Sequence, residues 1–394
     1  MTAPSRRLSG CFGARLDPEP QPVLEERARV RAFLAEMVDT GAMVATSDAW
    51  LSAHDPAFSR ALGARGWIGM TWPRQYGGAG ASMLARYAVV EELLVAGAPL
   101  AAHWFVDRQV GPGLLRRGTQ EQRARLLPPM SRGELYVCIG MSEAESGSDL
   151  GSVRTRARRV EGGWVVSGSK TWTSHASEAH LMLALVRTGE MDESPATALT
   201  QVFVDLARPG VTVRPIRMID GRSDFCEVFL DDVFVPDADV VGTPGRGWGQ
   251  VLDELAFERS GPERFLSTFP LVSRVVGALS DSRHDDAETT ALGALAARYL
   301  VLRAMSSRVN AALGGSATPG LEAAVVKELG TAFEVDSIDW ARSAVERVNG
   351  ADARHRLGAE VDEVLLHSPA FTLRGGTTEI MHGIIARELA GRRG

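Results

Sequence analysis

Cysteine is scarce in this chain of 394 residues. There are three, Cys11, Cys138 and Cys226, and they are widely spaced and odd in number. They show none of the spacings of a metal site and do not make up the even set of a disulfide framework. We therefore expect no metal centre, and a reducing compartment for the protein.

Long apolar runs and a positive net charge are also missing. The most apolar stretch, residues 87–106, is interrupted by Glu91 and Glu92, so we expect no membrane span. The first 22 residues contain several prolines and no apolar core of signal-peptide length. A formal net charge of -6 gives no reason to expect nucleic acid or an anionic membrane as a partner. We expect a cytoplasmic protein.

The periodicity of apolar residues changes twice along the chain. It is helical from about residue 23 to 135, and helical again from about 248 to the end. Between them lie short β-type runs such as "GWVVSGSKTWTS" and "CEVFLDDVFVP", which favour antiparallel pairing because no helix fits between them. We expect an N-terminal helical domain over 20–135, a β domain over 136–243 and a C-terminal helical domain over 244–394.

A polar loop opens the β zone, in "CIGMSEAESGSDLG". Ser142, Gly147 and Ser148 are small or hydrogen-bonding residues, and such a loop lets a backbone approach a phosphate or a ring closely. The alternative is a plain polar turn between a helix and a strand.

A tryptophan stands next to two hydroxyl groups in "GSKTWTSHA". Trp172 offers a flat π-face, and Thr173 and Ser174 could hydrogen-bond the edge of a planar cofactor stacked on it. The alternative is a tryptophan of the core or of an interface.

A glycine pair precedes the last helical run, in "FTLRGGTTEIMHGIIAREL". Gly375 and Gly376 are poor residues for a helix interior, whereas Thr377 and Thr378 suit a helix start. The end of such a loop can hold an anion or a carbonyl oxygen. The alternative is an ordinary helix–loop–helix connection.

A charged pair interrupts an apolar helix face in "LAFERSGPERF". The apolar positions recur at steps of three and four, and the same stepping reaches Glu258 and Arg259. The carboxylate either faces a functional pocket or belongs to a buried ion pair with Arg259 or Arg264. Adjacent helix residues do not face each other, which weakens the Glu258–Arg259 pairing.

Together and in this order, these motifs resemble the acyl-CoA dehydrogenase family of flavoenzymes. The resemblance also includes "GWIGMTWPRQYGGAG" and "EQRARLLPPMSRGE" and covers nearly the whole chain. It implies a mainly α fold with a central antiparallel β domain, an N-terminal helical domain and a C-terminal four-helix bundle. It further implies a homodimer or homotetramer, a heteromer being possible, with FAD bound between domains.

The resemblance also implies roles for individual residues. The expected FAD contacts are Met141, Ser142, Gly147, Ser148, Trp172, Thr173, Ser174, Thr377 and Glu379. The expected substrate contacts are Ser148, Arg259 and Gly376.

The implied reaction is α,β-dehydrogenation of an acyl-CoA thioester, in which a carboxylate takes the α-proton and FAD accepts the β-hydride. The base needs a desolvated setting that raises its pKa from about 4.3, and hydrogen bonds stabilise the enolate oxygen. Many members carry the base at the position of Gly375; a minority carry it on the helix after the β domain, before an arginine, which is Glu258 here. We expect Glu258 to be the base and the Gly375 N–H to bind the thioester carbonyl.

Two other interpretations stay open. Reduced flavin could pass its electrons to an electron-transfer flavoprotein or a similar acceptor, or to oxygen, as in an acyl-CoA oxidase. Alternatively, the chain could be a non-catalytic or partner-dependent subunit of a heteromeric enzyme. Gly375 favours that second idea, whereas Glu258 and the intact "KTWTS" argue against it.

Overall fold

The computed structural model describes residues 18–279, 286–313 and 319–391. The Gly, Ser and Pro residues at 314–320 predict a loop between two long helices. Most of that loop, and the N-terminal lead-in with Cys11, lie outside the described residues. In the described part, no helix is long and apolar enough to cross a membrane. The contacts divide the chain into two compact units: Met1–Trp50, Ser82–Pro99 and Ala256–Gly394 form the first, and Leu51–Ala81 and Leu100–Leu255 form the second.

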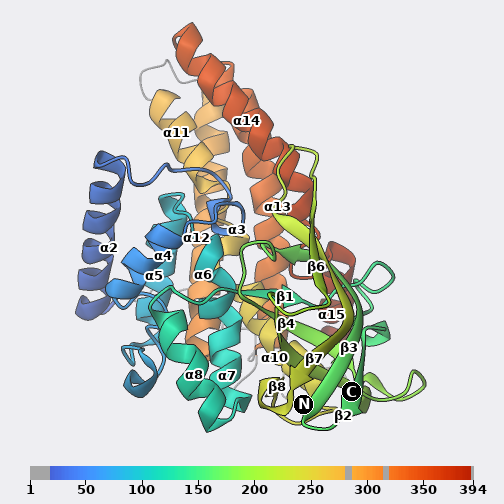
Figure 1. Cartoon of the computed structure of the whole chain (residues 1–394). Coiled ribbons are helices and arrows are strands. Elements are labelled where there is room, and N and C mark those ends of the chain that lie inside the picture. Colours follow the sequence, from blue (N-terminus) through green and yellow to red (C-terminus); the bar gives the residue numbers. More distant parts are fainter. Residues whose placement is uncertain (1–17, 280–285, 314–318, 392–394) are drawn as a thin grey trace, which may run out of the picture. The chain divides into compact units, whose positions relative to one another are not determined.

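The first unit is helical (Figure 1). Its long helices appear where the apolar periodicity predicts them, and α13 packs against both α12 and α14. The apolar faces of α11, α13 and α14 meet in one core, to which Leu271, Ile338 and Phe371 contribute. Helix α12 meets α13 in a smaller core that includes Val309 and Val326. The elements are α2 (Gln21–Asp39), α5 (Met83–Val95), η5 (Pro262–Arg264), α11 (Phe269–Leu279), α12 (Asp286–Leu313), α13 (Gly320–Val345), α14 (Ala351–Phe371) and α15 (Thr378–Gly391).

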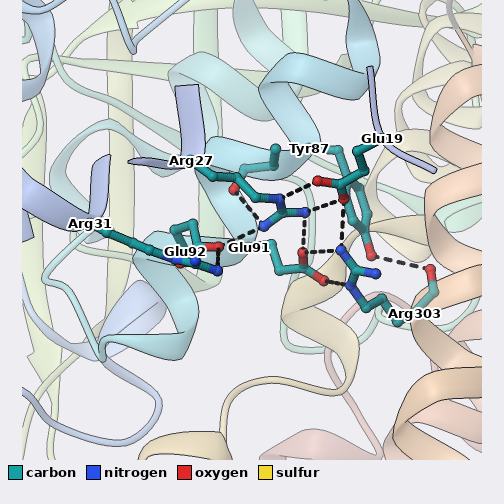
Figure 2. A network of polar contacts seen from close by, with 8 residues as sticks. Glu19, Arg27, Arg31, Tyr87, Glu91, Glu92 and Arg303 are labelled. Carbon is teal, nitrogen blue, oxygen red and sulfur yellow. Dashed lines mark hydrogen bonds and ion pairs between the residues drawn. The ribbon is translucent and has the colours of Figure 1, made fainter. Parts of the chain in front are cut away.

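A buried ion network links α2, α5 and α12 within this unit (Figure 2). Arg27 lies at its centre and contacts Glu91 at 2.5 Å and Glu92 at 2.7 Å. These carboxylates raise the pKa of Arg27 although burial opposes the charge. The other members are Glu19, Arg31 and Arg303. Each charge has a partner of opposite sign, as burial of ions requires.

The second unit combines helices with an eight-stranded sheet. The strands are β1 (Val137–Gly140), β2 (Arg156–Val160), β3 (Gly163–Ser174), β4 (Leu181–Arg187), β5 (Leu199–Asp205), β6 (Val211–Ile216), β7 (Phe225–Pro236) and β8 (Val240–Val241). The helices are α4 (Pro56–Ala64), η1 (Arg74–Tyr76), α6 (Ala101–Phe105), the π-helix η2 (Val106–Val110), α7 (Gly111–Arg117), α8 (Gln120–Ser131), η3 (Leu150–Ser152), α9 (Pro195–Ala198) and η4 (Asp237–Asp239).

Two helices include residues of both units. They are α3 (Ala49–Ser52) and α10 (Gly247–Ser260). Of the helices within residues 20–135, α2 and α5 belong to the first unit, and α4 and α6–α8 belong to the second.

The strand order is β6-β7-β3-β2-β4-β5-β8, with β1 beside β4. The pairs β2–β3, β3–β7, β4–β5, β5–β8 and β6–β7 are antiparallel, as predicted. The exceptions are β1, which runs parallel to β4, and a single parallel pair between Arg156 and Arg187. Strand β1 follows helix α8 instead of a hairpin, so nothing local reverses its direction.

A β-bulge in β3 shapes the region of the predicted cofactor residues. The register of β3 against β7 shifts between Lys170 and Thr173, which pair with Val228 and Cys226. One strand therefore holds an extra residue here, and such bulges re-aim side chains. The residue affected is Trp172, whose φ of 56° lies in the left-handed region.

Candidate functional site

The second unit holds the loop predicted to lie along a cofactor, and a partly buried carboxylate fixes this loop. Glu143 accepts hydrogen bonds from the backbone N–H of Arg154 at 2.7 Å and of Thr155 at 2.9 Å, and from Lys170 Nζ at 2.7 Å. Burial would raise the pKa of Glu143, but the Lys170 ammonium and these bonds outweigh it and lower the pKa. Burial in turn lowers the pKa of Lys170 to about 8.

This anchoring places Met141 and Ser142 beside the β3 bulge. Lys170 Nζ also lies 3.3 Å from the Met141 carbonyl oxygen. The Thr171 N–H donates to the Ser142 carbonyl oxygen at 2.9 Å, a bond that ties the loop to the bulged strand. Two further predicted residues, at positions 147 and 148, lie along the same loop and are exposed. The structure thus brings these predicted residues together on one stretch of the second unit.

Trp172 turns a large aromatic side chain toward solvent. The residue is 56% exposed, and the edge of its ring contacts Phe225 with ring centroids 6.0 Å apart. A left-handed backbone costs an ordinary residue about 1–2 kcal/mol. The fold therefore holds a large aromatic face outward at a cost, which is what stacking on a planar group requires.

Thr173 and Ser174 differ from Trp172 in exposure. Thr173 is fully buried, and its hydroxyl has no hydrogen-bond partner among the residues that the structure describes. Ser174 is 8% exposed. An unpaired buried hydroxyl is costly, so a bound group or a water is needed to satisfy it. The exposed tryptophan and the unpaired hydroxyl together fit a flat, polar-edged cofactor such as a flavin.

His175 follows directly and also has a left-handed backbone, with φ of 51°. Its Nε2 lies 2.6 Å from the Leu51 carbonyl oxygen, and its Nδ1 lies 3.7 Å from a Glu178 carboxylate oxygen. Burial opposes the charge, but Glu178 and the Leu51 carbonyl outweigh it and raise the pKa of His175. The same contact lowers the pKa of Glu178 to about 2.

The first unit holds the predicted base. Glu258 Oε1 lies 3.2 Å from Arg264 Nη2, and the Glu258 carbonyl oxygen accepts a hydrogen bond from Arg264 Nε at 2.9 Å. Of the two ion pairs considered from the sequence, the structure thus forms Glu258–Arg264. Arg259 instead donates from Nε to the Gly375 carbonyl oxygen at 3.1 Å. Burial lowers the pKa of Arg259, and the Glu258 charge opposes that effect.

The glycine pair forms the turn that the sequence predicts. Gly375 and Gly376 have φ of 75° and 100°, values that L side chains rarely adopt. Thr377 Oγ1 then accepts a hydrogen bond from the Ile380 N–H at 3.3 Å, and α15 begins after it. Exposed Glu379 lies in the first turn of α15, where its hydrogen bonds, including one with Thr377, lower its pKa.

Arg374 anchors this turn, a role that sequence reasoning missed. Its guanidinium lies over the rings of Trp50 and Phe371, 4.8 Å and 4.3 Å from their centroids. It bonds to Asp48 at 2.7 Å and to Glu334 at 3.2 Å, and burial raises the pKa of Glu334. The one local signal was an arginine directly before the two glycines.

Two further buried charges had no assigned role. Glu254 lies on α10, one turn before Glu258, and accepts hydrogen bonds from the Gln201 amide at 3.0 and 3.2 Å. It lines a cavity of about 20 Å³ that contains none of the predicted site residues. Lys327 on α13 is fully buried, and in the described part of the chain its ammonium has no hydrogen-bond partner. Burial lowers the pKa of Lys327 to about 8.

Comparison with family models matches most of the first 233 residues. Residues 24–134 match the model "Acyl-CoA dehydrogenase, N-terminal domain", and residues 138–233 match "Acyl-CoA dehydrogenase, middle domain".

Curated relatives match over almost the whole chain. Acyl-CoA dehydrogenase IpdE1 of Mycobacterium tuberculosis is 34% identical over 395 residues, covering 94% of this chain and 98% of the relative. Acyl-CoA dehydrogenase FadE34 of the same organism is 32% identical over 370 residues. That match covers 93% of this chain but 50% of the relative, so the chain spans about half the length of FadE34.

Solved structures with the same fold cover nearly all of the chain. The Tcur3481-Tcur3483 steroid ACAD has a TM-score of 0.81 at 25% identity and covers 95% of this chain and 98% of its own. The ChsE4-ChsE5 complex from Mycobacterium tuberculosis has a TM-score of 0.80 at 25% identity, covering 96% and 98%. The prolyl acyl carrier protein oxidase AnaB, at 18% identity and a TM-score of 0.83, shares the fold.

Proposed function

Since this chain belongs to the acyl-CoA dehydrogenase family of oxidoreductases, we propose that it catalyses the FAD-dependent α,β-dehydrogenation of an acyl-CoA or a related acyl thioester. When bound, FAD would supply the acceptor for the hydride that leaves the β-carbon of the substrate. The chain itself must bind the flavin, hold the thioester and remove the α-proton.

Flavin binding is assigned to the second-unit loop and the β3 bulge. Support comes from the outward face of Trp172 and the unpaired hydroxyl of Thr173. The residues proposed to contact FAD are Met141, Ser142, Gly147, Ser148, Trp172, Thr173, Ser174, Thr377 and Glu379.

Proton removal is assigned to Glu258. The observation that carries this assignment is a hydrogen-bonded corner in the first unit, made of Glu258, Arg259, Arg264 and Gly375. In this corner, Arg264 binds the Glu258 carboxylate and Arg259 binds the Gly375 carbonyl oxygen. A carboxylate and the glycine turn are thereby fixed in one hydrogen-bonded arrangement. In the proposal, the Gly375 N–H donates to the thioester oxygen and stabilises the developing enolate. Arg259, Gly376 and Ser148 contact the substrate.

The test is anaerobic titration of the purified yellow protein with a panel of acyl-CoA thioesters. The panel includes short and branched acyl groups, and also steroid-type acyl groups because one similar solved structure is a steroid ACAD. We expect flavin absorbance to bleach with one class, and Glu258→Gln to abolish bleaching. Asp336→Asn is the control, since this carboxylate forms an exposed ion pair on α13. Bleaching by Glu258→Gln at the wild-type rate would remove Glu258 as the base.

Electron transfer onward is proposed to go to an electron-transfer flavoprotein or a similar acceptor. The alternative is an oxidase that passes electrons to oxygen. Reoxidation of the reduced protein in aerated buffer distinguishes them: reoxidation faster than turnover indicates an oxidase, whereas slow reoxidation indicates a separate acceptor protein.

A second candidate is a subunit that works only with a different partner chain. It is favoured by the glycine at position 375, where many members carry their base, and by the ChsE4-ChsE5 complex among similar structures. A homodimer or homotetramer that is yellow and bleaches when purified alone supports the first candidate. A colourless or inert protein that gains both properties with a second chain supports the other.

A further inference from the structure

Two glycines make room for Arg264, Gly330 beside its backbone and Gly375 beside its side chain. The backbone carbonyl oxygen of Arg264 would be 2.5 Å from a Cβ at position 330, so Gly330 lets α13 approach the Arg264 backbone. A Cβ at position 375 would lie 2.9 Å from Arg264 Nη2 and 3.1 Å from Cζ. The residue is 2% exposed. The guanidinium thus occupies the volume that a side chain at position 375 would take.

From this position, the Arg264 side chain contacts both Glu258 and the residue that precedes the glycine turn. Its Nε and Nη2 bond to the carbonyl oxygen and to the carboxylate of Glu258, and its Nη1 lies 3.4 Å from the Arg374 carbonyl oxygen. A planar guanidinium with contacts in three directions has little freedom to rotate. It therefore fixes the position of the carboxylate oxygen that it binds.

We propose that Arg264 is a positioning residue for the base: it replaces the side chain absent at position 375 and holds the Glu258 carboxylate ionised and oriented toward the substrate. This inference rests on the proposed function, because it takes Glu258 to be the group that removes the α-proton. Nearby positive charge favours the ionised form of a carboxyl group and acts against desolvation. Loss of Arg264 therefore requires a higher pH to ionise Glu258.

Other charged groups lie on the elements that carry the pair and on those packed against them, and they affect the size of the expected shift. They are Arg259 on α10, Glu263 on η5, Lys327, Glu328 and Glu334 on α13, Arg374 before the turn and Glu379 on α15. Arg259 and Lys327 remain as cations when Arg264 is removed. We therefore expect a shift of about one pH unit, at the lower end of the usual effect of an opposite charge.

The experiment measures the rate of flavin reduction by a saturating acyl-CoA across pH, in the complete protein. In Arg264→Gln, the acid limb of the profile moves up by about one pH unit. In Arg264→Lys the acid limb moves less, because a lysine supplies the positive charge but not the planar guanidinium with its several N–H donors. Arg298→Gln is the control, since Arg298 on α12 forms an exposed pair with Asp336, and its profile stays unchanged. An unchanged acid limb in folded Arg264→Gln overturns the inference.

Glu258→Gln separates failure of this inference from failure of the proposed function. If Glu258→Gln reduces its flavin like the wild type, the base assignment is wrong and the inference falls with it. If Glu258→Gln is inactive while Arg264→Gln keeps the wild-type acid limb, the inference alone is wrong.

A pair of alanine variants tests the space at position 375 without removing Arg264. Gly375→Ala and Gly41→Ala impose similar backbone strain, since their φ values are 75° and 69°. A Cβ at Gly41 meets nothing within 4 Å, whereas one at Gly375 meets the Arg264 guanidinium. We expect Gly375→Ala to lower the unfolding temperature more than Gly41→Ala. We also expect it to move the acid limb of the flavin-reduction profile to higher pH. If both variants lower the unfolding temperature equally and the acid limb of Gly375→Ala does not move, Arg264 does not depend on the space left at position 375.

Discussion

The Arg259 side chain donates a hydrogen bond from Nε to the carbonyl oxygen of Gly375, 3.1 Å away and 116 residues further along the chain. This bond holds the peptide group that follows Gly375 in place. The glycine turn and the end of α10 are therefore fixed to each other by a charged donor, and bonds of this kind are stronger than neutral ones.

Replacing Arg259 tests this link. A hydrogen bond from a charged donor contributes about 1.5–3 kcal/mol. If the bond acts in full on the transition state, Arg259→Gln slows flavin reduction by about 10- to 100-fold. We expect Arg259→Lys to recover little, because a lysine has no Nε–H in that position. Stopped-flow reduction by acyl-CoA measures the effect, and a wild-type rate in both folded variants would contradict it.

The ion network around Arg27 makes a prediction about stability. Removing one partner of a buried pair leaves an uncompensated charge, which typically costs about 3–5 kcal/mol. Arg27→Met should therefore lower the free energy of unfolding by about that amount. Arg31 is the matched control: it contacts Glu92 from a side chain that is 66% exposed, so Arg31→Met should cost less than about 1 kcal/mol. Urea denaturation of the apoprotein compares the two, and equal effects would contradict the prediction.

Local periodicity predicted most of the elements. The helical periodicity over about 23–135 and from about 248 onward corresponds to helices such as α2 and α13, and the β-type run "GWVVSGSKTWTS" corresponds to β3. Strand β2, "RARRV", was missed because Ala157 is its one buried residue. Its position comes from pairing with β3, which no local pattern carries.

The candidate site was predictable as residue types but not as geometry. "KTWTS" marked Trp172, yet its left-handed backbone depends on the register between β3 and β7, two strands distant in sequence. "FERSGPERF" marked Glu258 and offered two arginines as partners. The choice of partner for Glu258 depends on Gly375, because the carbonyl oxygen of that glycine accepts the hydrogen bond from Arg259. Arg264 is then the arginine that pairs with Glu258.

The contact between His175 and Glu178 predicts a bell-shaped contribution to stability against pH. The pKa of Glu178 is lowered from 4.5 to about 2, so its contribution is present above pH 4.5 and is lost as the pH falls through about 2. The pKa of His175 is raised above 6.5, so its contribution is present below pH 6.5 and is lost as the pH rises through the folded value. His54 and Asp224 also face this histidine.

We therefore expect the difference in unfolding temperature between wild type and His175→Gln to be largest between pH 4.5 and 6.5. His382→Gln is the control, because the contact between His382 and Glu328 comes from a side chain that is 63% exposed. Thermal unfolding from about pH 2 to about pH 9 brackets both titrations and measures both variants. A difference for His175→Gln that does not vary with pH would show that the pair contributes nothing.

Trp172 should be dispensable for folding and needed for the cofactor. Trp172→Gly relieves left-handed strain of about 1–2 kcal/mol but loses the edge contact with Phe225 and adds the backbone entropy of glycine. These effects nearly cancel, so apoprotein stability should stay within about 1 kcal/mol of wild type. FAD affinity should fall by about tenfold or more, because the stacking face is gone. Trp172→Phe should lie between, and Ile219→Ala, which trims a side chain that is 77% exposed, should leave FAD affinity unchanged. Flavin fluorescence measures the affinity and urea denaturation the stability; unchanged FAD binding by Trp172→Gly would place the flavin elsewhere.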